Sequence, residues 1–336
     1  SVQSTSEAEE SSGFYFEAGK KLLERNQAQQ NEGSGFRMLN RAIGKETRTN
    51  THFNLSLEIT KFILEQCKGI RWEKEGDLQW GFDEKAERVI IKSRWALEES
   101  RNKQKTSQMG DYLDFNGNKK APWTRKYPGR IHSVMICYGV VSIGSCAFCA
   151  CSELTSIVIP CGVTSIGRWA LKECTRLKTV SIPESVETID TNPFDGCDQL
   201  YSIDVSPGSQ SFISLEGVLF NKDITQLISY PGAKVGGYEI PNSVKIIGNE
   251  AFRRCSLLDG ITIADGLESI GEEAFYGCTK LESVVIPPTV KNIAERAFRN
   301  CSCLDTVSLP RALSHRKGAF PRSSNIATYT TEYKVL

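Results

Sequence analysis

The sequence has few of the residue types and patterns that catalysis and membrane insertion need. Its 336 residues include only three histidines, His52, His132 and His315, which lie far apart along the chain. No run approaches the roughly 18 consecutive apolar residues of a membrane-spanning helix. The 41 basic and 40 acidic residues leave a formal net charge of +1, so no overall field attracts nucleic acid or a membrane. We therefore expect neither a nucleic-acid partner nor a membrane-spanning segment.

The motifs of an active site are absent as well. Ser133 follows His132 directly, and adjacent side chains on a strand point apart, so the two do not form a nucleophile–base pair. The glycines from Gly232 to Gly237 lack the G-K-[ST] ending and the following helix of a phosphate-binding loop. No loop has the spaced aspartates and glycine turn of a calcium site. We predict a protein without catalytic residues, metal or cofactor; a hydrolase that uses the N-terminal region is a weaker alternative.

The strongest positive pattern is a repeat of 23 residues. The stretch from Leu281 to Pro287 reads L-x-x-V-x-I-P. Related stretches begin at Ile131, Leu154, Leu177, Leu200, Val235, Leu258 and Leu304. A second pattern, V-x-x-I-G-x-x-A-F-x-x-C, lies between these stretches, for example from Leu267 to Cys278. A fixed period of this length is typical of a solenoid, in which each unit stacks on its neighbours.

The combined unit, A-F-x-x-C-x-x-L-x-x-V-x-I-P-x-x-V-x-x-I-G, resembles the leucine-rich repeats of the BspA type over roughly residues 131–320. Members of that family are commonly adhesive proteins of the cell surface or secreted proteins, so the resemblance implies that setting here. We predict a mainly β solenoid: a right-handed leucine-rich-repeat arc of about eight rungs. A β-hairpin cap and an N-terminal α-helical region are expected to precede it, because an open end of stacked strands needs a cap.

Changes in the pattern divide the chain into regions. Residues 14–70 contain short stretches with helical spacing of apolar residues. The unit that starts at Leu200 is 35 residues long, and its additional residues alternate around Asn221-Lys222-Asp223, which predicts a β-hairpin. The expected regions are a flexible tail at 1–13, a helical N-terminal region at 14–70, a β cap at 77–130, repeats at 131–320 with a hairpin insertion at about 206–234, and a C-terminal cap strand at 321–336.

Half of the twelve cysteines occupy one repeat position: Cys151, Cys174, Cys197, Cys255, Cys278 and Cys301. This placement predicts small buried side chains stacked along the solenoid. Among the others, Cys146 and Cys149 have the C-x-x-C spacing of a zinc or redox site, with Cys137 and Cys161 within reach. The other interpretation is an accidental spacing, because Phe148 between them is a core repeat residue. No second spaced pair completes a zinc tetrahedron, so the sequence leaves open whether these four thiols pair or bind metal.

The variable positions of each L-x-x-V-x-I strand should face solvent, because side chains alternate between the two sides of a strand. Stacked in register, they form a middle column of Ser, Thr and Gly and a group of carboxylates in the later strands. We predict that this concave face binds a partner, with Tyr201 as an aromatic anchor. The candidate ligand-binding residues are Lys178, Tyr201, Asp204, Glu239, Asp259, Glu282 and Asp305. The other interpretation is that small residues suit a curved sheet and that the acids are only a solvated surface.

The function predicted from these features is non-catalytic recognition of a protein or glycan, with a basic partner at the C-terminal half of the concave face. The family resemblance favours an adhesin-like protein that is secreted or held at the cell surface. The alternative is an intracellular scaffold or effector that uses both the helical region and the solenoid, which reduced cysteines favour. The chain starts with Ser1-Val2-Gln3-Ser4, without signal-peptide features, but removal of a leader would leave the same kind of start.

Overall fold

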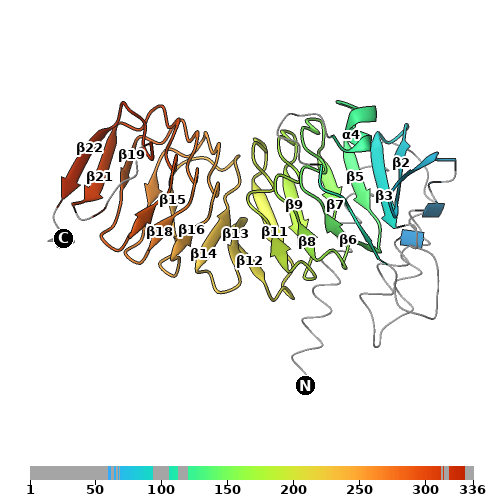
Figure 1. Ribbon diagram of the computed structural model, residues 1–336, viewed down its shortest axis with the longest axis horizontal. Helices are drawn as coiled ribbons and strands as arrows, with labels where there is room; N and C mark the ends of the chain where they lie inside the picture. The colour runs from blue at the N-terminus through green and yellow to red at the C-terminus, as the bar shows by residue number, and fades with distance from the viewer. Residues whose placement is uncertain are drawn as a thin grey trace, which may run out of the picture.

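The computed structural model describes residues 60–61, 64–65, 67, 69–93, 106–112, 120–311, 313 and 318–329. These residues form an elongated, mainly β solenoid of about eight turns (Figure 1), which confirms the predicted repeat architecture. The tail predicted at 1–13 and most of the helical region predicted at 14–70 lie outside the described residues.

The L-x-x-V-x-I stretches form a row of parallel strands, which we call the LxxVxI ladder. Its strands are β3 (Arg88–Ser93), β5 (Ser133–Ile136), β7 (Ser156–Val158), β9 (Thr179–Ile182), β11 (Ser202–Val205), β15 (Tyr238–Glu239), β17 (Ile261–Thr262), β19 (Ser283–Val285), β21 (Thr306–Pro310) and β22 (Asn325–Tyr329). Directly paired residues of β5 to β21 are 23 positions apart, as Ser283 of β19 and Thr306 of β21 are. Leu154, Leu177 and Leu281, which open three of the repeats, are fully buried. The predicted register is therefore confirmed.

The V-x-x-I-G stretches form a second row of short strands. These are β4 (Ser107–Gln108), β6 (Val140–Ile143), β8 (Ser165–Ile166), β10 (Thr188–Ile189), β14 (Gln226–Ser229), β16 (Ile246–Ile247), β18 (Ser269–Ile270) and β20 (Asn292–Ile293). They also pair in parallel at the repeat spacing, as Ile247 with Ile270 and Ile270 with Ile293. Two parallel rows joined by tight turns leave a flat interior that side chains must fill.

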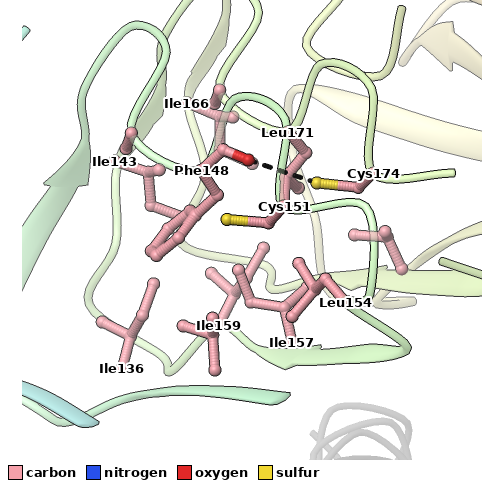
Figure 2. Close-up of a cluster of buried hydrophobic side chains, with 14 of the residues drawn as sticks. Ile136, Ile143, Phe148, Cys151, Leu154, Ile157, Ile159, Ile166, Leu171 and Cys174 are labelled. Atoms are coloured by element: carbon pink, nitrogen blue, oxygen red, sulfur yellow. Dashed lines mark hydrogen bonds between the residues drawn. The ribbon is translucent and has the colours of Figure 1, made fainter. Parts of the chain in front are cut away.

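The core consists of branched and aromatic side chains that recur once in each turn. Figure 2 shows part of it, with Leu154 and Ile157 of the ladder gathered near Phe148. In the later turns the phenylalanine rings stack, with the centroids of Phe275 and Phe298 4.8 Å apart. Each ring therefore packs against its copies in the turns before and after, which is how a one-dimensional array gains stability.

The repeat cysteine adds a hydrogen bond between turns. The Cys174 thiol donates to the Phe148 carbonyl at 3.3 Å (Figure 2), and the Cys278 thiol donates to the Phe252 carbonyl at 3.1 Å. All six repeat cysteines are buried and free of disulfides. Burial raises the pKa of Cys151 to about 12, so a thiol in this row keeps the proton that such a bond requires. Cysteine thus serves here as a small apolar residue that also donates a hydrogen bond.

The N-terminal cap combines antiparallel strands with one short helix. β1 (Trp72–Glu75), β2 (Leu78–Asp83) and β3 pair antiparallel, and β3 then pairs in parallel with β5. The cap sheet begins at Trp72, ahead of the boundary predicted at residue 77. Helix α4 (Pro122–Lys126) buries Trp123, whose Nε1 donates to the Ala147 carbonyl at 2.8 Å. At the opposite end, β22 pairs in parallel with β21.

An insertion made of the hairpin of β13 (Val218–Asn221) and β14 with the neighbouring strand β12 (Phe212–Leu215), here called the hairpin, divides the solenoid into two blocks. The first block has ladder strands β3 to β11, and the second has ladder strands β15 to β22. The strands of the hairpin lie between β11 and β16 in Figure 1. Leu219 packs in the core of the first block, whereas its neighbours Val218 and Phe220 pack in the core of the second. Because side chains alternate between the two sides of a strand, β13 contributes to the cores of both blocks.

Three ladder residues depart from the predicted inward and outward pattern. Val235, expected to point inward, is 76% exposed. The reason is the hairpin: the Gly217 carbonyl accepts the Ile203 N–H at 2.9 Å and so takes the place beside β11. Ser133 and Met135, expected to face solvent, are 8% exposed. Met135 packs in a small cluster with Cys67 from the preceding segment, which covers the start of the ladder.

Candidate functional site: the exposed face of the ladder

The exposed side of the LxxVxI ladder, here called the ladder face, carries the variable side chains of each repeat. In β19, Val284 points into the core at 2% exposed, while Ser283 and Val285 on either side of it are exposed. This alternation follows from the pleat of a strand. The 23-residue register then stacks equivalent variable positions into columns, so the face has a regular composition along the solenoid.

The first block places three predicted residues on this face. Tyr201 is 55% exposed and directly follows Lys178 in its column, with its N–H donating to the Lys178 carbonyl at 3.0 Å. Lys178 is also exposed. Asp204 is only half-exposed, and one of its carboxylate oxygens accepts the Ser202 hydroxyl at 2.6 Å. Tyr201 and Lys178 are therefore available to a partner, whereas part of the hydrogen-bonding capacity of Asp204 is used within the fold.

The second block brings the predicted carboxylates together. Asp259, Glu282 and Asp305 lie on consecutive turns, and we call them the acidic column. The backbone links them directly: the Glu282 N–H donates to the Asp259 carbonyl at 3.4 Å, and the Asp305 N–H donates to the Glu282 carbonyl at 3.0 Å. All three side chains, and Glu239 on β15, are exposed. Across the described ranges, none of these four carboxylates lies within 4.0 Å of a basic side chain.

Some carboxylates elsewhere on the solenoid are paired with basic side chains one turn away. Lys291 Nζ lies 2.8 Å from Glu268 Oε2, and Arg296 Nη1 lies 3.3 Å from Glu273 Oε1, each pair joining neighbouring turns. The hydrogen bond from Lys291 lowers the pKa of Glu268 below its ordinary value. Opposite charges on adjacent strands stabilise a sheet, and like charges destabilise it. The acidic column differs from these pairs, because its three members carry one sign.

Beside the acidic column, the ladder face exposes bare backbone. A Cβ atom placed on Gly236 would meet nothing within 4 Å, and one on Gly237 would meet only Gly260 on the next turn. The approach to the main chain is therefore open at the start of the second block. Val285, 50% exposed, supplies an apolar contact on the same face.

A group of largely buried charges, which the repeat pattern did not predict, joins the two blocks. Glu250 accepts hydrogen bonds from Arg168 at 2.8 Å and from Trp169 Nε1 at 3.0 Å. Arg253 Nε lies 3.2 Å from Asp195 Oδ1, and burial raises the pKa of Asp195. These partners come from opposite sides of the hairpin insertion, so the 23-residue spacing gave no signal for them. Their burial indicates a structural role in holding the blocks together.

A second surface feature is a hollow of about 550 Å³ over the second row of strands. Its lining includes Asp111, Ser142, Ser165, Thr188 and Asp190. One Asp111 carboxylate oxygen already accepts the Ser145 N–H at 2.7 Å. None of the predicted ligand-binding residues lines this hollow, so it is separate from the ladder face.

The four thiols that the sequence left open do not converge. Cys137 is buried with Cys67 in the small cluster at the start of the ladder, whereas Cys146 and Cys149 lie together in a half-buried turn. Cys161 is half-buried beside the ring of Tyr138. In the described part of the chain, no three His, Cys, Asp or Glu side chains gather as a metal ion would require.

A parallel ladder of L-x-x-V-x-I strands, stacked at 23-residue intervals with a variable exposed face, defines a leucine-rich-repeat protein. The chain belongs to the family described as BspA type leucine rich repeat region, whose model matches residues 126–233 and 229–335. None of the curated proteins compared with the chain matches it. None of the helices within the described ranges combines the length and the apolar character that crossing a membrane takes.

Several bacterial structures are similar to the chain. A leucine-rich repeat protein from Eubacterium ventriosum is 25% identical, with a TM-score of 0.47 over 70% of this chain and 71% of that one. The pneumococcal vaccine antigen PcpA is 20% identical, with a TM-score of 0.45 over 79% and 89% of the two chains. A leucine rich cell surface protein from Faecalibacterium prausnitzii is 20% identical, with a TM-score of 0.36 over 79% and 99%.

Proposed function

We propose that this protein is a non-catalytic recognition module that binds a protein or glycan partner through the ladder face. A basic segment of the partner lies over the acidic column. The single observation that carries the proposal is that Asp259, Glu282 and Asp305 stand exposed on consecutive turns without ion-pair partners in the described ranges.

The energetics of the column support a cationic partner. Neighbouring strands of a sheet lie about 4.8 Å apart, so the three carboxylates are held close to one another. Like charges at such positions destabilise the sheet, and the fold elsewhere pairs opposite charges at this spacing, as Lys291 with Glu268. A row of cations laid along the column removes that repulsion. Relief of this repulsion therefore adds a favourable term to the free energy of binding.

The shape of the face supports an extended partner. The uncovered main chain at Gly236 and Gly237 lets another backbone approach closely, and Val285 offers an apolar contact beside the carboxylates. In the first block the same face offers the ring of Tyr201 and the cation of Lys178. Exposed aromatic rings are the residues in which interface free energy most often concentrates. A partner that spans both blocks meets Tyr201 first and the acidic column second.

Two cellular settings fit this function. Membership of the BspA type family favours an adhesin-like protein that is secreted or held at the cell surface. One observation favours the alternative, an intracellular scaffold or effector: all twelve cysteines are free, and disulfides are common in secreted proteins. The gene sequence upstream of residue 1 separates the two settings, because a secreted protein requires a leader.

The acidic column is tested by neutralising it. The triple variant Asp259→Asn, Glu282→Gln, Asp305→Asn is compared with the unchanged chain for binding of a fluorescent lysine–serine peptide and of chitosan oligosaccharides, as cationic protein and glycan probes. We expect at least a tenfold loss of affinity for the preferred probe. The matched control neutralises three exposed acids away from the ladder face, Glu187→Gln, Asp265→Asn and Glu272→Gln. Equal losses in the two triple variants would reduce the effect to net charge and refute the proposal.

A further inference from the structure

Cys146 and Cys149 stand at the two ends of a four-residue turn in the first block. The Cys149 N–H donates to the Cys146 carbonyl at 3.2 Å, and Cys146 has a φ of 57°. Such a turn brings the Cα atoms of its first and fourth residues within about 7 Å. A disulfide joins Cα atoms about 4.4–6.8 Å apart, so this backbone suits one without rearrangement.

The same turn recurs in later repeats with other residues at its two ends. Lys172 Nζ lies 4.3 Å from the ring centroid of Trp169, and Arg253 Nε lies 3.9 Å from Glu250 Oε2. Trp169 and Glu250 share the positive φ, at 55° and 58°. The turn therefore directs its first and fourth side chains to one place, where they touch. In this repeat the two side chains are thiols.

The surroundings give the two thiols different acidities. A hydrogen bond with Cys149 lowers the pKa of Cys146, and the cations of Lys172 and Arg168 lower it further. The same hydrogen bond, followed by burial, raises the pKa of Cys149. Both cysteines are half-buried, whereas the six repeat cysteines are buried. Cys146 is thus suited to attack as a thiolate, whereas Cys149 remains a protonated thiol beside it.

The other cysteines lack this combination. Cys174 and Cys197 also touch, but both are buried, and burial raises the pKa of Cys174. Cys303 is exposed, and its near neighbour in sequence, Cys301, is fully buried with its thiol donated to the Phe275 carbonyl at 3.0 Å. Cys174 and Cys197 therefore serve as an internal control for two thiols that touch but are buried. Cys303 serves as a control for an exposed thiol without a second thiol beside it.

We propose that Cys146 and Cys149 form a reversible redox pair that exchanges with small-molecule disulfides such as glutathione disulfide. The Cys146 thiolate attacks one sulfur of the disulfide, which forms a mixed disulfide and releases one glutathione thiolate. Cys149 then loses its proton to solvent and attacks the Cys146 sulfur, which closes the Cys146–Cys149 disulfide and releases the second glutathione thiolate. The protein loses two electrons, and the glutathione disulfide gains them.

The test uses the full chain, equilibrated in mixtures of reduced and oxidised glutathione, quenched with acid and alkylated with N-ethylmaleimide. Chymotrypsin then cuts the denatured protein after Phe148, between the two cysteines, so that only a disulfide keeps the fragments together. We expect the linked species to rise with the oxidised fraction and to disappear on treatment with dithiothreitol. In Cys149→Ser, Cys146 should keep one glutathione as a mixed disulfide.

The pH dependence of alkylation supplies a second readout. The hydrogen bond from Cys149 lowers the pKa of Cys146, so Cys149→Ala should move the N-ethylmaleimide profile of Cys146 to higher pH than in the unchanged chain. Melting curves of the variants should match the parent, because Trp169 and Lys172 fill the same positions in a folded repeat. Two labelled thiols at every glutathione ratio in the unchanged chain would overturn the proposal. So would a disulfide from Cys149 to Cys151 in place of Cys146.

Discussion

The replacement Leu281→Ala probes the packing on which the ladder depends. Leu281 is fully buried in the second block, together with Leu258 and Leu304 of the adjacent turns. The change removes three carbon atoms, and about 0.8 kcal/mol for each gives about 2.4 kcal/mol in lost transfer free energy. The cavity that remains adds to this loss, so we expect the free energy of unfolding to fall by about 2–5 kcal/mol.

Urea unfolding followed by circular dichroism measures this loss, and hydrogen exchange of second-block peptides locates it. The matched control is Ser283→Ala, two residues further along the chain with an exposed side chain, which should change stability by about 0.5 kcal/mol or less. A repeat array can unfold in parts, so the two variants are compared by the shift of one common transition. If Leu281→Ala unfolded at the same urea concentration as the parent, the inward placement of the repeat leucine would be wrong.

Three further changes test separate parts of the structure. Cys278→Ala should lower stability in urea by about 0.5–1.5 kcal/mol, because it removes the thiol hydrogen bond of 3.1 Å to the Phe252 carbonyl, which keeps the Cys255 N–H as its other donor; no change would show that the thiol bond contributes nothing. Burial raises the pKa of Asp195 above 3.8 in the folded chain, so this group adds stability as pH falls from its folded pKa towards 3.8. Asp195→Asn should abolish that gain, and the urea midpoint of the parent relative to the variant should therefore rise on acidification; a constant difference would contradict the assignment. Tyr201→Ala should weaken binding of the partner without changing the melting curve, because the ring is 55% exposed; equal affinity would remove Tyr201 from the interface.

The repetitive part of the fold was predictable from the sequence because its energetics are local and periodic. A side chain such as Leu177 packs against its own copies in the neighbouring turns, so a 23-residue spacing contains most of the information about its surroundings. The pairing of β13 with β14 was predictable for the same reason, since alternation and a turn sequence specify a hairpin locally.

Most of the features that the sequence did not predict lie where the 23-residue period is interrupted. Val235 was expected in the core, but the hairpin occupies the place beside β11 and leaves this side chain exposed. The pairing of Arg168 with Glu250 joins residues on opposite sides of the insertion, so no repeat spacing connects them. The acceptors of four repeat thiols were missed for a simpler reason: for Cys174, Cys197, Cys278 and Cys301 the acceptor lies three residues before the equivalent cysteine of the preceding turn, as Phe148 does for Cys174.

For the predicted site residues, some properties could be predicted from the sequence and others could not. Asp259, Glu282 and Asp305 could be assigned to one column because they occupy one repeat position, and their shared exposure follows from the pleat. The internal hydrogen bond that holds Asp204 could not be assigned in this way, because it depends on the rotamer of Ser202. That no basic side chain of the described residues lies within 4.0 Å of the column is likewise a property of the folded surface.

The most direct test of the ladder face as the binding surface is site-specific photocrosslinking. A photoreactive amino acid is placed at Ser283, directly after Glu282 of the acidic column, and in a second protein at Glu272, exposed away from the ladder. With the lysine–serine peptide or the chitosan probe that the neutralisation experiment selects, we expect a crosslink from position 283 and none above background from position 272. Equal crosslinking from both positions, or crosslinking from position 272 alone, would contradict it.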